Sequence, residues 1–139
     1  MFKHIMAPVD LAHLDGLEHA LKVTADIAKL YDCDVTYVGV AANTPGKLGH
    51  NPDEFRSKVA EFAAQQGELH GLKTKGHAMT SHDPTTELDD ALMKGVDETG
   101  ADLVVMQSHV PGLMDYIWPS NGGKVAGHAK CSVLVVRGD

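Results

Sequence analysis

Residues 101–137 read ADLVVMQSHVPGLMDYIWPSNGGKVAGHAKCSVLVVR, and this stretch decides the fold of the chain. It contains an apolar run at 103–106, a loop of small polar residues, a short helical stretch and a second apolar run at 133–136. This order predicts two buried strands connected through a helix that starts after Ser120 and Asn121. A helix start beside the carboxyl end of a parallel strand is an arrangement that holds a phosphate group.

The preceding hundred residues repeat the same alternation of strand and helix. Asn51-Pro52 and Asp83-Pro84 each pair a capping side chain with a proline in the first turn, which predicts two helix starts. The whole chain then alternates through five strands and four helices, which predicts an open, doubly wound α/β sandwich with a parallel sheet. The elements expected before residue 101 are strands at 4–9, 34–41 and 74–80, and helices at 13–31, 51–70 and 83–100.

Composition narrows the class of protein. The 139 residues are 43% hydrophobic and 22% charged, as expected for one globular domain spanning 1–139. The net charge of −7 argues against a nucleic-acid partner, because that binding depends on clustered lysine and arginine. No apolar stretch approaches the roughly 18 residues that cross a bilayer, and no secretory signal is visible. Cys33 and Cys131 are far apart, which favours free thiols in the cytoplasm.

Three connections are expected to meet at the carboxyl edge of the sheet, where open α/β folds bind their ligands. An apolar slot for a flat base is expected there. Asp10 adds one acid, suited to a ribose hydroxyl or to a divalent cation. Ser120 and Asn121 would leave helix N–H groups available to an anion. The apolar side chains of the slot are Pro8, Val9, Val40 and Met106.

Several features have a simpler explanation. A Ser-Asn pair before a helix is often only a cap, and an acid after a strand is often only a loop residue. Ser108 and His109 are adjacent at a strand end and point in opposite directions, which argues against a Ser-His-Asp triad. The histidines show no metal-ligand spacing, so no metal site formed by protein alone is expected. Gly122-Gly123-Lys124 lacks the leading glycine and the hydroxyl residue of a P-loop.

Over essentially its whole length the chain resembles the universal stress proteins. The resemblance lies in the opening IMAPVD at 5–10, in DLVVM at 102–106 and above all in HAKCSVLVVR at 128–137. It implies the fold of that family, an adenine nucleotide alpha hydrolase-like or Rossmann-like sandwich.

The nucleotide-binding members of that family usually carry three spaced glycines after the fourth strand. Here Gln107, Val110 and Pro119 stand at those positions, and the loop is one residue shorter. The chain instead resembles an ATP-binding subgroup with a Ser-His-x-Pro loop, a tyrosine, and Ser-Asn before the last helix. Its matching residues are Ser108, His109, Pro111, Tyr116, Ser120 and Asn121.

Carried over by position, the resemblance implies a binding site for ATP, with ADP or AMP as alternatives and Mg²⁺ accompanying the nucleotide. Pro8 and Val9 would flank the adenine, with Val40 packed on it and Asp10 facing the adenine or the ribose. Met106 and Gln107 would line the ribose side. The ribose and phosphates would be bordered by Ser108, His109 and Pro111, and the phosphates held by Ser120, Asn121 and Gly122.

The function implied is that of a regulatory or sensor protein with little or no catalytic turnover. The resemblance also implies a homodimer or larger homo-oligomer, formed through the last strand (Val133, Leu134, Val135 and Val136), and a protein partner that the sequence does not name. Two alternatives stay open: a nucleotide-free module acting through protein contacts, and a slow ATPase or phosphotransferase. A flavin carrier is a third, on fold alone.

Overall fold

The structure is a computed structural model that describes residues 1–42, 52–81, 84–107 and 129–137. Strands and helices alternate along the described chain, as the sequence predicts. Their order is β1 (His4–Val9), the 3-10 helix η1 (Leu11–Leu17), α1 (Glu18–Tyr31), β2 (Asp34–Ala42), α2 (Pro52–His70), β3 (Thr74–Ser81), α3 (Pro84–Thr99), β4 (Leu103–Gln107) and β5 (Ser132–Val136).

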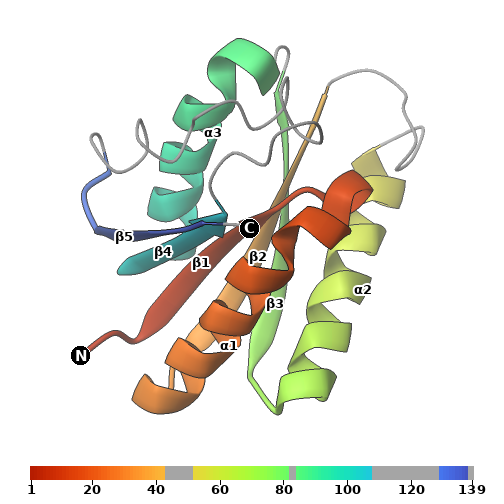
Figure 1. Ribbon diagram of the computed structural model, residues 1–139. Coiled ribbons are helices and arrows are strands. Elements are labelled where there is room, and N and C mark those ends of the chain that lie inside the picture. The colour runs from red at the N-terminus through yellow and green to blue at the C-terminus, as the bar shows by residue number, and fades with distance from the viewer. Residues whose placement is uncertain (43–51, 82–83, 108–128, 138–139) are drawn as a thin grey trace.

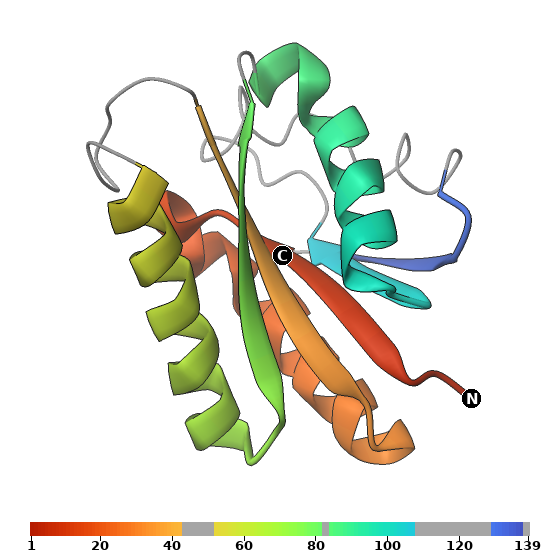
Figure 2. The same cartoon turned by 180° about the vertical axis from the view of Figure 1, so that it is seen from behind.

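All five strands form one parallel sheet in the order β3-β2-β1-β4-β5 (Figure 1). The helices α1 and α2 lie on one face of this sheet, and α3 lies on the other face, as the two opposite views show together (Figures 1 and 2). The chain proceeds from β1 toward β3 on one side and then returns to β4 and β5 on the other. Because successive crossovers keep one hand, this reversal transfers α3 to the opposite face. The prediction of an open, doubly wound parallel sheet is confirmed.

The first helix differs from its prediction. The apolar spacing predicts a continuous helix from residue 13, but the structure has a 3-10 helix up to Leu17 and an α-helix only from Glu18. Leu17 occupies the N-cap and makes no side-chain capping hydrogen bond, and Gly16 precedes it. Glycine is a poor helix former, and no local cap fixes an earlier start. Three α-helices lie within the described residues, and the fourth predicted helix lies outside them.

The central strands form the core. Every residue of β4 is buried, and β1 is buried from Ile5 to Val9, as expected for parallel strands covered on both faces. Tyr37 of β2 packs edge-to-face on Phe62 of α2, with ring centroids 5.4 Å apart. Its hydroxyl is buried without a hydrogen-bond partner in the described structure, and burial raises the pKa of Tyr37 to about 12.

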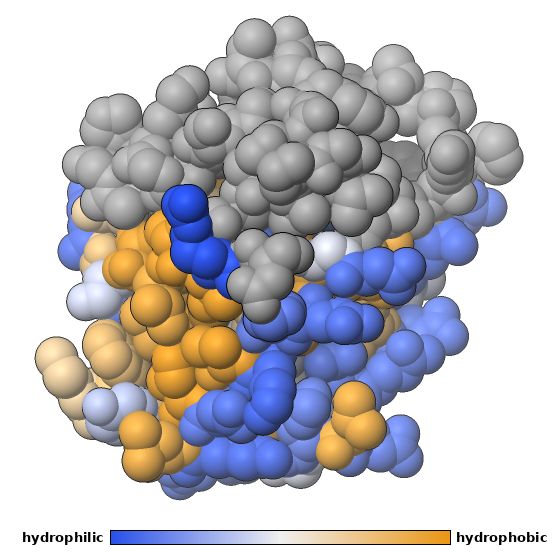
Figure 3. Space-filling model, in the orientation of Figure 1, coloured by the Kyte–Doolittle hydropathy of each residue, from blue (hydrophilic) through white to orange (hydrophobic). Residues whose placement is uncertain are grey.

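The strand β5 forms the edge of the described sheet opposite β3. Its residues are either exposed or half-buried. Leu134 is 37% exposed, and Val133, Val135 and Val136 pack only partly against the core. Hydrophobic side chains gather on the left of Figure 3, where β5 and β4 lie in the same view, beside the hydrophilic helices. The last strand therefore carries an apolar surface at a sheet edge.

Candidate functional site

The pairing between β1 and β4 is shorter than the pairing of either strand with its other neighbour. The strand β1 pairs with β2 along its full length, and β4 likewise with β5. In contrast, β1 and β4 pair only at Ile5–Leu103 and Met6–Val104, although the strands continue to Val9 and Gln107. The ladder between them therefore stops before their carboxyl ends. This is also the point where the strand order reverses, which is where open α/β sheets bind ligands.

Asp10 directly follows β1 at this point and is only 8% exposed. Burying a carboxylate is costly unless hydrogen bonds or opposite charges compensate it. Asp10 is thus a buried carboxyl group that has interactions of its own, beside the point where the β1–β4 ladder stops. The sequence predicts an acid at this edge of the sheet, and the structure places it there.

The predicted apolar slot is divided between the two faces of the sheet. Met6 lies on the α3 face, because its Sδ would be 3.3 Å from a Cβ at Gly95. Strand alternation then places Pro8 on that face, and Pro8 is in register with Val38 of β2. By the same alternation Val40 and Met106 share the α3 face, whereas Val9 lies on the α1 face. Pro8, Val40 and Met106 thus share one face of the sheet, and Val9 lies on the other.

Gln107, the last residue of β4, points toward α1. Its side-chain Oε1 accepts a hydrogen bond from the backbone N–H of Ala20 at 3.2 Å. The residue is 4% exposed, and its Nε2 has no hydrogen-bond partner in the described structure. The carboxamide is therefore engaged on the α1 face, opposite the face of Pro8 and Met106. No local sequence signal indicates this contact, because the two residues are 87 positions apart.

The other predicted contacts fall in the loop and helix after β4. Ser108, His109, Pro111, Ser120, Asn121 and Gly122 lie outside the described residues, and their roles stay predictions. Within the described ranges, no group of three or more histidine, cysteine, aspartate or glutamate side chains could hold a metal ion. Among the same residues, no helix is long and apolar enough to cross a membrane.

The two cysteines are free. Burial is the main cause that raises the pKa of the Cys33 thiol, and the Asp102 carboxylate adds to it. Burial also raises the pKa of the Cys131 thiol. The Cys33 Sγ donates a hydrogen bond to the carbonyl oxygen of Phe2 at 3.2 Å. A raised pKa keeps a thiol protonated and weakly nucleophilic, so neither cysteine has the character of a catalytic thiolate.

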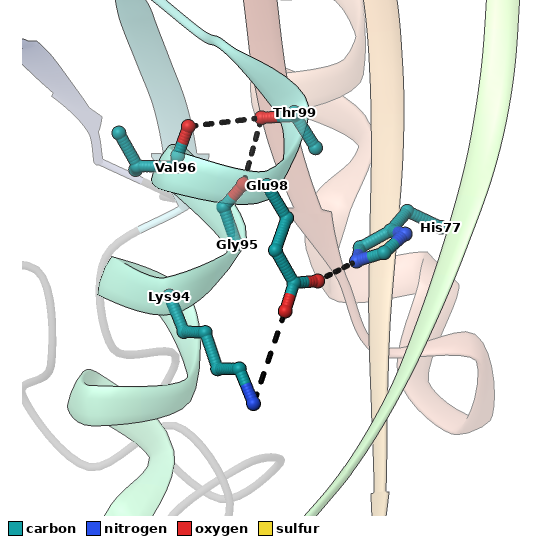
Figure 4. Close-up of polar contacts among 6 residues, drawn as sticks. All are labelled: His77, Lys94, Gly95, Val96, Glu98 and Thr99. Carbon is teal, nitrogen blue, oxygen red and sulfur yellow. Dashed lines mark hydrogen bonds and ion pairs between the residues drawn. The ribbon is translucent and has the colours of Figure 1, made fainter.

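A second polar cluster joins β3 to α3 (Figure 4). His77 Nε2 lies 2.7 Å from Glu98 Oε2, and Lys94 Nζ lies 3.9 Å from the other oxygen of the same carboxylate. The Thr99 hydroxyl donates to the carbonyl oxygens of Gly95 and Val96 in the last turn of α3. The His77 and Glu98 side chains are more than 30% exposed, so the contact fastens α3 to the edge strand rather than forming a site.

Comparison with known proteins agrees with this geometry. The family model described as "Universal stress protein family" matches residues 1–137. Universal stress protein G from Shigella flexneri is 26% identical over 148 residues, covering 99% of this chain and 100% of that protein.

Two solved structures share the fold. One, a universal stress protein in complex with cAMP, has a TM-score of 0.68 at 16% identity and covers 99% of this chain and 98% of its own. The other, a universal stress protein family protein from Arabidopsis thaliana with AMP bound, has a TM-score of 0.66 at 16% identity, covering 99% and 92%. With a family match that spans nearly the entire chain, this protein belongs to the universal stress protein family.

Proposed function

We propose that this protein binds an adenine nucleotide, ATP together with Mg²⁺, at the carboxyl ends of β1 and β4. It acts as a cytoplasmic regulator or sensor with little or no turnover. The observation that carries the proposal is the end of the β1–β4 ladder beside the buried Asp10. At that point β1 and β4 are no longer paired with each other, and a buried carboxyl group directly follows β1.

The residues at this edge fit a nucleoside. Three apolar residues share one face of the sheet there: Val40, which is half-buried, and Pro8 and Met106, which are buried. An apolar face of this kind is what a flat base requires. Asp10 supplies an acceptor for a ribose hydroxyl or an adenine amino group, and among the described residues at this edge it is the acid that could assist Mg²⁺. The nucleotides bound to two proteins of the same fold, cAMP and AMP, support adenine as the base.

Low turnover is supported by the chemistry of the described residues. Fast phosphoryl transfer normally combines several acidic metal ligands with a phosphate-facing cation. Asp10 is a single acid, and both thiols have raised pKa values. The two free cysteines also suit the reducing compartment that the proposal assigns.

Two alternatives remain as candidates. Gln107 favours a nucleotide-free interaction module, because it stands where nucleotide-binding members of the family usually carry a glycine. A slow ATPase would release phosphate from ATP above the background rate. Freshly purified protein is expected to carry an adenine nucleotide, which mass spectrometry of small molecules released by denaturation detects. Protein that carries none and acquires none after incubation with ATP and Mg²⁺ would favour the interaction module.

We further propose a homodimer or larger homo-oligomer through β5, because an exposed apolar edge strand readily pairs with a second copy. At micromolar concentration, light scattering is expected to give at least twice the chain mass of 14.8 kDa. A charge at the edge, Leu134→Lys, is expected to shift the protein toward the monomer. The matched control is Leu30→Lys at the end of α1, where the native leucine is 74% exposed. A monomeric wild type would contradict this assignment.

A further inference from the structure

Hydrogen bonds lie at both ends of the junction between β1 and β4: they join Asp102 to the start of β1 at the amino end, and β4 to α1 at the carboxyl end. At the amino end the Asp102 carboxylate accepts hydrogen bonds from the backbone N–H groups of Lys3 and His4, at 2.9 and 3.0 Å. The Asp102 N–H in turn donates to the carbonyl oxygen of His4 at 3.0 Å. This end of the junction is also where the strands pair, at Ile5–Leu103 and Met6–Val104. The amino end is therefore held both by the ladder and by a side chain.

At the carboxyl end the ladder is absent, and among the described residues the backbone N–H of Ala20 in α1 donates a hydrogen bond to the side chain of Gln107 in β4. Ala20 is the third residue of α1, the helix that follows β1 through η1. A hydrogen bond between the first turn of α1 and the last residue of β4 therefore spans the opening on its α1 face. The opposite face, with Pro8 and Met106, has no part in this link.

The contact also replaces a missing helix cap. Helix starts leave backbone N–H groups that need an acceptor, usually a side chain at the N-cap. Leu17 at that position provides none, and Gln107 Oε1 serves Ala20 instead. The arrangement leaves Gln107 Nε2 buried without an acceptor in the described structure. The unsatisfied Nε2 destabilises the fold, whereas an apolar side chain at this position would instead leave the buried N–H of Ala20 without its acceptor.

We propose that Gln107 is a positioning residue for nucleotide binding: its hydrogen bond to α1 fixes the spacing of the carboxyl ends of β1 and β4. This inference rests on the proposed function, since it concerns the same site. Beyond the end of the ladder, this hydrogen bond is a contact between described residues that helps to hold the spacing on which a base beside Pro8, Val40 and Met106 depends. Gln107 then acts on the ligand through the strands, from the face that the base does not occupy.

The test compares three variants, each of which removes the hydrogen bonds at one end of the junction. Gln107→Met keeps the length of the side chain but removes the acceptor, and Gln107→Leu removes it with a different shape. Asp102→Ala removes the link at the amino end, away from the site. Calorimetric titration with AMP is carried out well below the unfolding temperature of each variant. Both Gln107 variants are expected to weaken AMP binding by about 3- to 10-fold, the effect of losing one hydrogen bond. Asp102→Ala is expected to bind AMP as the wild type does.

The outcomes separate the inference from the function on which it rests. If the Gln107 variants bind AMP with the affinity of the wild type, the positioning role is wrong while the nucleotide site stands. An equal loss in Asp102→Ala would also overturn it, because the effect would then follow stability rather than position. A wild type that binds neither AMP nor ATP would overturn both the function and the inference.

Discussion

Replacing Asp10 with alanine is expected to weaken the binding of AMP by about 10- to 150-fold, which corresponds to roughly 1.5–3 kcal/mol for a hydrogen bond to a charged group. The carboxylate is 8% exposed at the end of β1, where the ladder to β4 has stopped. An acceptor held in so little water keeps most of its electrostatic strength toward a ribose hydroxyl or an adenine amino group. Calorimetric titration of the variant with AMP measures the loss.

The control for this experiment keeps the change in net charge and moves it away from the site. Asp15 is exposed on η1, five residues further along the chain, and Asp15→Ala is expected to leave the affinity for AMP unchanged. Asp10→Asn keeps one accepting oxygen and should bind AMP with intermediate affinity. Equal affinities in Asp10→Ala and Asp15→Ala would show that the nucleotide does not contact Asp10. Thermal unfolding of each variant reports whether the fold is intact.

Gly76→Ala is expected to lower the free energy of unfolding by about 1–3 kcal/mol, the usual cost of forcing an extra carbon into closely packed space. A Cβ at Gly76 of β3 would lie 2.8 Å from the carbonyl oxygen of Val59 and 2.9 Å from the Cα and N of Ala60. All three atoms belong to the backbone of α2, so no side-chain rotation relieves the clash. The helix would have to move away from the sheet. Urea denaturation followed by circular dichroism measures the change.

Lys75→Ala provides the matched control for Gly76→Ala, because Lys75 is exposed and precedes Gly76 in the same strand. A surface change of this kind usually alters stability by no more than about 0.5 kcal/mol. Equal denaturation midpoints for Gly76→Ala, Lys75→Ala and the wild type would contradict the close packing of α2 on β3. The sheet would then tolerate a wider separation from this helix than the structure has.

The parts of the fold that were predictable from sequence have local causes. The strand β1 spans His4–Val9, the same residues as its apolar run, and α2 and α3 begin at the prolines of their predicted caps. The backbone N–H at the first position of a helix has no partner within the helix, so proline, which has no N–H, is favoured there. A capping residue followed by proline therefore indicates a helix start in the sequence. The start of α1 lacked any such signal. Its acceptor is Gln107, 87 residues away, and only the folded chain brings the two together.

The candidate site was predictable only in outline. The reversal of strand order follows from the alternation of elements, and this places Asp10 and Gln107 at one edge of the sheet. Which face each side chain occupies depends on register and alternation, and these separate Val9 from Pro8 and Met106. The burial of Asp10 and the early end of the β1–β4 ladder are tertiary properties without a sequence pattern of their own.

Calorimetric titration of the unmodified protein with ATP and Mg²⁺, and separately with AMP, tests the central claim most directly. The expected result is saturable binding of an adenine nucleotide at one site per chain, with GTP as the control for recognition of the base. Saturation by ATP or AMP, lost in Asp10→Ala and kept in Asp15→Ala, would agree with a nucleotide held at the carboxyl ends of β1 and β4. Absence of binding heat for both adenine nucleotides at several temperatures would contradict it.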